Sequence, residues 1–271
     1  MMFKEFSGLY YFHNRSFLST DNISIDYLKN GISYYEVLRV INGKPLFLKD
    51  HLERFEMSVR KSLFPDFLKN YDFNSIISQL CSINRLKEGN IKMVLNITEK
   101  PSLYIYFVPH RYPTPENYTH GIKMLSQKLE RPDPAIKAVN LNLREKTESL
   151  IQQHGIYEIL LVDQNGMVTE GSKSNIFFIK DKKVFTAPEH TVLSGITRKY
   201  VFSVCHDLSV DLVEQCIPFE IIASYEAVFI SGTSPKILPV KQIDNISFHV
   251  NNLTMKNIIT RYENIIQKSI L

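Results

Sequence analysis

Alternating apolar and polar residues predict strands in the first part of the chain. Asn42-Gly43 is typical of a two-residue hairpin turn and separates two of these segments. The alternation predicts four strands, over residues 34–40, 46–48, 91–98 and 103–108. Asp50 with Glu53 three residues later predicts the N-cap and capping box of a first helix. Apolar residues three and four positions apart predict a second helix over 73–85.

Three prolines between residues 109 and 118 indicate a boundary, because proline disfavours both helix interiors and central strands. We therefore expect a linker over 109–121, a smaller domain over 1–115 and a larger one over 116–271. Strands of the second part are expected over 156–162, 167–170, 176–179, 184–186 and 227–231. Helices are expected over 143–154, from 195 through 204, and over 254–267. Strands punctuated by helices predict an α+β architecture.

Composition excludes some classes of protein but does not indicate a particular function. The chain has 271 residues, 44% hydrophobic and 22% charged, and a formal charge of +4. Basic residues are dispersed among acidic ones, so nucleic acid is not indicated as a partner. The histidines form no His-x-x-x-His pair, and no metal site is expected. No apolar run is long enough for a signal peptide or a bilayer span, so we expect a cytoplasmic protein without membrane contact.

Lys137 and Glu170, 33 residues apart, are the strongest candidates for chemistry. A pyridoxal phosphate enzyme needs a neutral amine that forms an imine with the cofactor. It also needs a carboxylate that holds a proton on the ring nitrogen. Either residue alone would by default be a surface charge, and the motifs around them decide otherwise.

Several of these motifs are similar to those of the class IV (fold type IV) pyridoxal phosphate aminotransferases. That family includes D-amino-acid and branched-chain aminotransferases and aminodeoxychorismate lyase. The resemblance is carried by the family's motifs in the family's order, at residues 35–40, 50–55, 169–175, 193–198 and 231–234. It implies two α+β domains with the cofactor in the interdomain cleft, Lys137 and Glu170 in the second domain, and a homodimer.

The resemblance also implies a role for each candidate residue. Lys137 would form the imine and move a proton between the substrate and the cofactor, and Glu170 would pair with the ring nitrogen. Leu193 would pack on the ring, although a core leucine is a ready alternative. The expected phosphate anchors are Arg54, Ile196, Thr197 and Thr233. For Thr197 simple N-capping, and for Arg54 a surface salt bridge to Glu53 or Glu56, are the alternatives.

Expectations for the substrate are less specific. Tyr35, Ser234 and Arg111 are candidate substrate contacts, while a core tyrosine and a solvated His110-Arg111 pair are the alternatives. Glu99 stands where D-amino-acid enzymes carry arginine, which argues against a D-amino-acid preference. The leading hypothesis is amino transfer between an amino acid and a 2-oxo acid. Aminodeoxychorismate lysis to 4-aminobenzoate and pyruvate, or a non-catalytic cofactor-binding relative, are the alternatives.

Overall fold

The structure, a computed structural model, describes residues 6–23, 28, 30–60, 62–134 and 136–271. The chain divides into two compact units. Unit 1 comprises Met1–Arg111, Ile136–Val139 and Ile266–Leu271, and unit 2 comprises Tyr112–Ala135 and Asn140–Ile265. The mixture of helices and strands in each confirms the α+β class.

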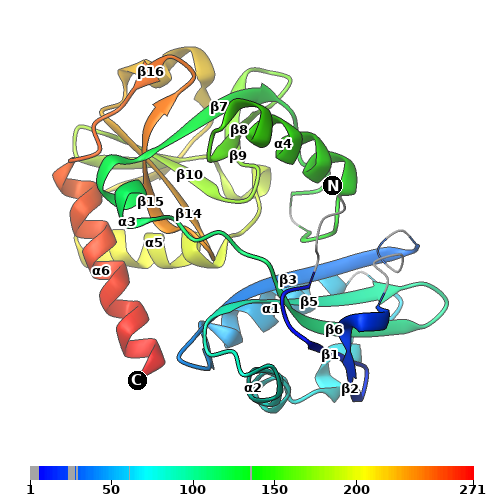
Figure 1. The fold of residues 1–271 in the computed structure, drawn as a ribbon. Coiled ribbons are helices and arrows are strands. Elements are labelled where there is room, and N and C mark those ends of the chain that lie inside the picture. Colours follow the sequence, from blue (N-terminus) through cyan, green and yellow to red (C-terminus); the bar gives the residue numbers. More distant parts are fainter. Residues whose placement is uncertain (1–5, 24–27, 29, 61, 135) are drawn as a thin grey trace. The chain divides into compact units, whose positions relative to one another are not determined.

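Unit 1 is built on a six-stranded antiparallel sheet in the order β2-β1-β6-β5-β3-β4 (Figure 1). The strands are β1 (Tyr10–His13), β2 (Ser16–Ser19), β3 (Ile32–Ile41), β4 (Lys44–Pro45), β5 (Gly89–Ile97) and β6 (Pro101–Val108). Its helices are α1 (Leu48–Val59) and α2 (Phe73–Asn84), with short 3-10 turns at Thr20–Asn22 and Phe67–Asn70. Fully buried Leu38 and Ile91 of the sheet pack in one core with Phe55 of α1 and Leu80 of α2. The two helices therefore cover one face of the sheet.

The β3–β4 connection explains one success and one error of the sequence analysis. Asn42 and Gly43 both have positive φ, at 52° and 76°, as a type I′ hairpin requires, so the predicted turn is confirmed. The expected strand at 46–48 and the N-cap at Asp50 are wrong. The backbone turns into the left-handed region at Phe47 (φ 55°), and α1 begins at Leu48, so Asp50 lies in its first turn. Burial of Leu46 and Leu48 outweighs the capping signal.

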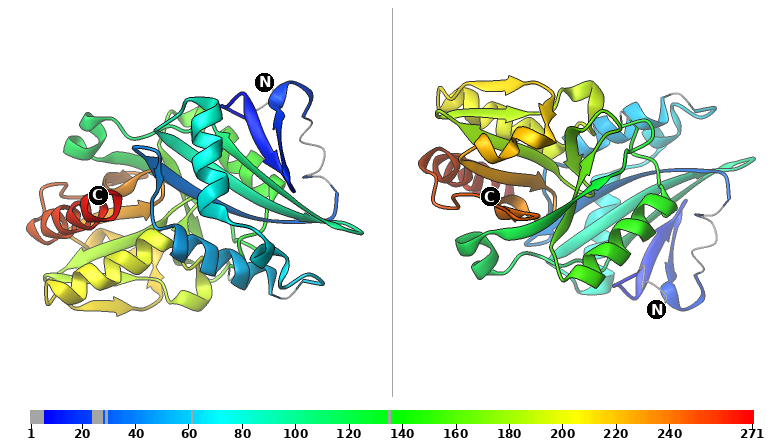
Figure 2. Two further views of the ribbon diagram at one scale, coloured as in Figure 1. Left: turned by 90° about the horizontal axis from the view of Figure 1, so that it is seen from below. Right: turned by 90° about the horizontal axis from the view of Figure 1, so that it is seen from above.

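Unit 2 is built on a larger mixed sheet in the order β12-β11-β10-β14-β15-β7-β8-β9-β13, with β16 paired to β15 (Figure 2). Its first five strands along the chain are β7 (Ile122–Lys128), β8 (Glu158–Val162), β9 (Met167–Gly171), β10 (Asn175–Lys180) and β11 (Lys183–Thr186), followed by helix α5 (Ile196–Asp207). Those after it are β12 (Leu212–Glu214), β13 (Ile217–Pro218), β14 (Ala227–Gly232), β15 (Lys236–Ile243) and β16 (Ile246–Ser247). The α-helices are α3 (Pro115–His120), α4 (Leu141–His154), α5 (Ile196–Asp207) and α6 (Leu253–Ile270), with 3-10 turns at Glu189–Thr191 and Phe219–Ser224.

The centre of the unit 2 sheet is apolar on both faces, as in a layer covered from two sides. Buried Phe178, Val228 and Leu238 belong to one core cluster, and on neighbouring strands the rings of Phe177 and Phe229 stack with centroids 4.9 Å apart. The turn at Asn165-Gly166 joins antiparallel β8 and β9, as predicted. This hairpin carries the residues around Glu170.

The chain crosses from unit 1 to unit 2 within the expected linker over 109–121, which also contains helix α3. Pro115 occupies the start of the helix, where its missing N–H costs nothing. Thr114 caps the helix, and Asn117 completes a reciprocal capping box. The prolines thus begin a helix rather than prevent one.

The division into units also differs from the expected domains. The chain passes from unit 1 to unit 2 after Arg111, and the short segment Ile136–Val139 is assigned to unit 1. Lys137 therefore groups with the N-terminal unit and not, as expected, with the C-terminal one, because its segment pairs with a strand of unit 1. Among the described residues, no helix combines the length and apolar character that crossing a membrane requires.

Candidate active site

The backbone of Lys137 is held by unit 1 on two sides. The amide of Tyr35 on β3 donates to the Lys137 carbonyl at 2.9 Å, and the amide of Val139 donates to the Ser33 carbonyl at 2.9 Å. Tyr34 and Ala138 form an antiparallel bridge between these two bonds. The Lys137 amide also donates to Ser58 Oγ of α1 at 3.3 Å. A lysine in a segment bridged to a strand has a fixed backbone, which a positioned nucleophile requires.

The side chain of Lys137 lies over an aromatic ring. Its Nζ is 4.8 Å from the centroid of the Tyr35 ring, within the range of a cation–π contact. Lys92 of β5 is buried, and its Nζ lies 5.4 Å from the same ring and 6.0 Å from that of Tyr106. Two amines therefore share one half-buried tyrosine, which makes this face of the sheet suited to anionic groups.

Arg54 belongs to a charged cluster around Glu36, a residue that the sequence analysis did not single out. Glu36 is fully buried and accepts from Arg54 Nε at 2.7 Å, Arg54 Nη2 at 2.8 Å and His51 Nδ1 at 2.8 Å. Burial favours a higher pKa for Glu36, but the Arg54 charge and the hydrogen bonds from both partners prevail and lower the pKa to about 2. Burial is also the main cause that lowers the pKa of His51, against the hydrogen bond to Glu36. A neutral His51 thus donates from Nδ1 to a charged Glu36.

The cluster around Glu36 shows which carboxylate Arg54 pairs with. The alternative reading proposed a surface salt bridge to Glu53 or Glu56, whereas the bidentate pair in the structure is made with buried Glu36 on β3. This pair fixes the plane of the guanidinium by two parallel hydrogen bonds. A phosphate contact by Arg54 stays a prediction.

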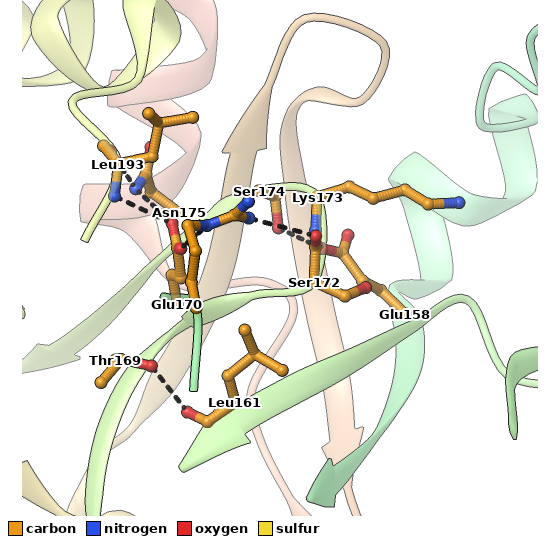
Figure 3. A network of polar contacts seen from close by, with 10 residues as sticks. Glu158, Leu161, Thr169, Glu170, Ser172, Lys173, Ser174, Asn175 and Leu193 are labelled. Carbon is orange, nitrogen blue, oxygen red and sulfur yellow. Dashed lines mark hydrogen bonds and ion pairs between the residues drawn. The ribbon is translucent and has the colours of Figure 1, made fainter. Parts of the chain in front are cut away.

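In unit 2, the Glu170 carboxylate lies at the end of β9 with its side chain buried (Figure 3). Its Oε1 accepts from Arg131 Nε at 2.6 Å. Its Oε2 accepts from the Leu193 amide at 3.2 Å and, at the long distance of 3.5 Å, from Asn175 Nδ2. The guanidinium and these polar donors compensate the burial of the carboxylate. The sequence analysis missed Arg131, which only a search for a cation near a buried glutamate would have found.

The turn after Glu170 rests on a second buried carboxylate, Glu158 of β8. Glu158 Oε1 accepts from the Lys173 amide at 2.6 Å and from Ser174 Oγ at 2.9 Å. Burial raises the pKa of Glu158, opposed by these hydrogen bonds and by the Lys173 charge. The Ser172 carbonyl accepts from Arg131 Nη2 at 3.4 Å, so the arginine contacts both Glu170 and the turn.

The segment leading into α5 is tied to the same network. Asn175 Nδ2 donates to the Leu193 carbonyl at 2.9 Å. A Cβ on Gly195, the N-cap of α5, would overlap Asn175 Oδ1, so a larger residue here would have to displace the Asn175 amide. Ile196 and Thr197 then occupy the first turn of α5, both buried, where helix N–H groups point out of the helix.

Thr233 and Ser234 lie in the turn that follows β14, both half-buried. β14 pairs with β10 so that Ser231 stands opposite Asn175. Ser231 Oγ is buried and finds no hydrogen-bond partner among the described residues. A buried hydroxyl of this kind has unused capacity for a polar ligand.

A hollow of about 290 Å³ adjoins Glu170 within unit 2. Glu130, Asp163 and Thr169 line it together with Arg131 and Glu170. Three carboxylates against one guanidinium make this hollow unsuitable for a phosphate group.

The structure thus gathers the candidate residues in two sets. Lys137, Tyr35 and Arg54 belong to unit 1, and Arg111 is an exposed residue at the end of that unit. The residues of unit 2 lie at the end of β9, just before and at the start of α5, and after β14: Glu170, Leu193, Ile196, Thr197, Thr233 and Ser234. Their individual roles stay predictions.

Comparison with protein families now adds to this geometry. Residues 33–243 match the family described as amino-transferase class IV, which covers more than half of the chain and all the candidate residues. The chain belongs to the class IV amino-transferases. The resemblance found in its motifs is confirmed.

The relatives place this chain among enzymes with different substrates. A D-alanine aminotransferase from Bacillus licheniformis is 25% identical over 79% of this chain and 80% of its own. The structure of the Escherichia coli branched-chain amino acid aminotransferase matches with a TM-score of 0.79 at 22% identity, covering 96% of this chain and 95% of that one. A T.th. branched-chain enzyme complexed with N-(5'-phosphopyridoxyl)-L-glutamate matches with a TM-score of 0.81 at 18% identity, over 98% and 96%. These likenesses confirm the fold of the two-domain fold type IV enzymes.

Proposed function

We propose that this protein is a pyridoxal phosphate-dependent aminotransferase that moves an amino group between an amino acid and a 2-oxo acid. The observation that carries the proposal is Glu170, a buried carboxylate on a family motif, held by Arg131 and by the Leu193 amide. When bound, the cofactor would supply the aldehyde and the electron-accepting ring. The phosphopyridoxyl compound named for the T.th. relative supports this choice of cofactor.

The residues present fit such a group. Glu170 offers carboxylate oxygens for a ring N–H, and Leu193 N–H orients that carboxylate. The start of α5 and the following β14 turn offer backbone and hydroxyl donors at Ile196, Thr197 and Thr233, which suit a phosphate dianion. The buried Ser231 hydroxyl beside that turn has the unused hydrogen-bonding capacity that a polar ligand would meet.

Within unit 1, Lys137 would be the nucleophile and the base. Its backbone is hydrogen-bonded to β3 and to Ser58, which limits the positions from which its amine can accept and donate a proton. Tyr35 beneath it limits water on one side of the amine. Arg54, oriented by Glu36, is the further cation proposed for the phosphate. Tyr35, Ser234 and Arg111 are the proposed substrate contacts.

The substrate class is an amino acid with a 2-oxo acid acceptor. The relatives named for D-alanine and for branched-chain amino acids make both stereochemical series candidates. Glu99, on the connection after β5, stands where the resemblance implies an arginine in D-amino-acid enzymes, which argues against a D-amino-acid preference.

The test is spectroscopic. Protein reconstituted with pyridoxal phosphate should show an absorption band at roughly 410–430 nm, which an imine of Lys137 produces. The band should bleach with an amino donor from a panel of L- and D-amino acids and return with a 2-oxo acid. Lys137→Ala should lose the band. Absence of any band in the folded wild-type protein would contradict the proposal.

The same panel separates the alternative reactions. Pyruvate and 4-aminobenzoate released from aminodeoxychorismate without an added oxo acid would identify a lyase instead. Activity that Lys137→Ala leaves unchanged would identify a role for the cofactor that does not use this lysine.

A further inference from the structure

We infer that Glu158 positions Glu170 by holding the turn between β9 and β10 through hydrogen bonds. This inference rests on the proposed function. In the part of the chain that the structure describes, no hydrogen bond joins the two carboxyl groups directly. Glu158 acts instead on the four residues from Gly171 to Ser174, which lie between Glu170 and Asn175 in the chain (Figure 3).

The turn donates two hydrogen bonds to Glu158. The Lys173 amide and the Ser174 hydroxyl both donate to Glu158 Oε1, at 2.6 and 2.9 Å. A backbone bond from the Gly171 amide to the Ser174 carbonyl, at 2.7 Å, closes the turn itself. Glu158 is only 2% exposed, so removal of its carboxylate takes away the buried acceptor of both donors.

One end of this turn joins Glu170, whose carboxylate is proposed to bind the cofactor, and the other end joins Asn175, which contacts that carboxylate. Glu170 precedes it, and Asn175 follows it with its amide directed to Glu170 Oε2 and to the Leu193 carbonyl. The Ser172 carbonyl in the turn is in addition a partner of Arg131, whose Nε holds Glu170 Oε1. A displaced turn therefore changes several contacts of Glu170 at once.

Gly171 gives independent support for a specific contact between Glu158 and the turn. A Cβ at this position would overlap both Glu158 Oε1 and Ser174 Oγ. Glycine suits this position because the carboxylate approaches the backbone closely, and not because of a positive φ. The residue after Glu170 is adapted to Glu158.

The charge of Glu158 is not what the turn needs. Burial raises the pKa of Glu158, but one carboxyl oxygen accepts hydrogen bonds in either protonation state. Glutamine keeps such an oxygen at the same place. The inference therefore predicts that Glu158→Gln retains the function that Glu158→Ala loses.

The experiment compares two ligands that differ at the ring nitrogen. Dissociation constants of the apo-protein are measured for pyridoxal phosphate and for its analogue in which carbon replaces that nitrogen. Only the first ligand uses Glu170, so Glu158→Ala should weaken pyridoxal phosphate about tenfold, as for a lost buried hydrogen bond, and the analogue much less. Glu158→Gln should resemble the wild type with both ligands.

Two further variants keep the test decisive. Glu148→Ala is the matched control, because Glu148 pairs with the Lys173 side chain from α4 and leaves the bond from the Lys173 amide intact. It should change neither constant. If Glu158→Ala does not fold, Ser174→Ala, which removes one of the two bonds, should show the same selectivity to a smaller degree.

The outcomes also separate this inference from the proposed function. A wild-type protein that binds no pyridoxal phosphate contradicts the function. A wild-type protein that binds it, together with Glu158→Ala and Ser174→Ala variants that weaken both ligands equally or neither, overturns the positioning role alone. Hydrogen exchange of the Lys173 backbone amide in the apo-protein measures the stability of the turn without any ligand, and its rate should increase in Glu158→Ala.

Discussion

Each unit buries a glutamate next to the proposed active-site residues, and the two are stabilised by different means. Glu36 of unit 1 is paired with the Arg54 guanidinium and the His51 ring, and the pKa of Glu36 falls to about 2. Glu158 of unit 2 is held by one backbone amide and one hydroxyl, and burial raises its pKa. The Arg54 cation at hydrogen-bond distance reverses the effect of burial on the pKa of Glu36, whereas the dipolar donors and the Lys173 charge do not reverse it for Glu158.

The contrast has a consequence for what each residue can do. Glu36 must stay ionised, because a neutral side chain would take away the carboxylate partner of Arg54 at a site that is only 11% exposed. Glu158 needs only its acceptor oxygen. Glu36 is therefore a counter-ion of Arg54, whereas Glu158 is a hydrogen-bond acceptor that holds the turn in place.

The largest effect is expected for Glu36→Gln. Removing one partner of a buried ion pair typically costs about 3–5 kcal/mol in the free energy of unfolding. The measurement is urea denaturation at neutral pH. Glu53→Gln, at an exposed position of α1, is the control and should stay within about 0.5 kcal/mol of the wild type. A Glu36→Gln variant as stable as this control would show that the pair contributes nothing to folding.

The pH dependence of the same variant gives the next effect. A carboxyl group whose pKa is lowered from 4.5 to about 2 on folding contributes stability above pH 4.5 that is lost as the pH falls through 2. The contribution is about 3 kcal/mol, from about 1.4 kcal/mol per pKa unit. The deficit of Glu36→Gln relative to the wild type should therefore shrink steadily below pH 4.5. Denaturation curves of both proteins measure it, and a deficit that is constant with pH would refute the assigned charge state.

The sequence predicted most of the elements that carry these residues. Strand alternation around Tyr35, the Asn165-Gly166 turn before Glu170 and the start of α5 at Ile196 are local signals, and the structure confirms each. The short strands β1, β2, β4, β12, β13 and β16 were missed, because two to four residues are too few positions for a period to show. The longer strands β7 and β15 were missed as well.

The partners of the candidate residues could not be predicted in this way. Glu36 and Arg54 are 18 positions apart, and Arg131 and Glu170 are 39 apart, so their pairing depends on the tertiary fold. The motif around Lys137 likewise gave no sign that its segment would join β3 of unit 1. Local patterns indicate elements, whereas compensation of a buried charge is decided by residues distant in sequence.

Gly171→Ala is expected to have a smaller effect than Glu36→Gln. The added Cβ must displace the Glu158 carboxyl or the Ser174 hydroxyl, and overpacking of this kind typically costs about 1–3 kcal/mol. The cost should fall in a Glu158→Ala background, where the overlapping oxygen is gone. A double-mutant cycle by urea denaturation measures this coupling. Additive single effects would show that the two residues do not meet.

The smallest expected effect, and the sharpest difference between the two units, is the pH dependence of Glu158→Gln. A carboxyl group whose pKa is raised on folding contributes stability below its unfolded value, near 4.5, and loses that contribution as the pH rises through its folded value. Glutamine removes this loss while keeping the acceptor, so Glu158→Gln should gain stability relative to the wild type as the pH rises from 4.5. This trend is opposite to that of Glu36→Gln. Stability differences measured by denaturation across this pH range test the sign, and a parallel trend in the two variants would mean that both glutamates act as counter-ions.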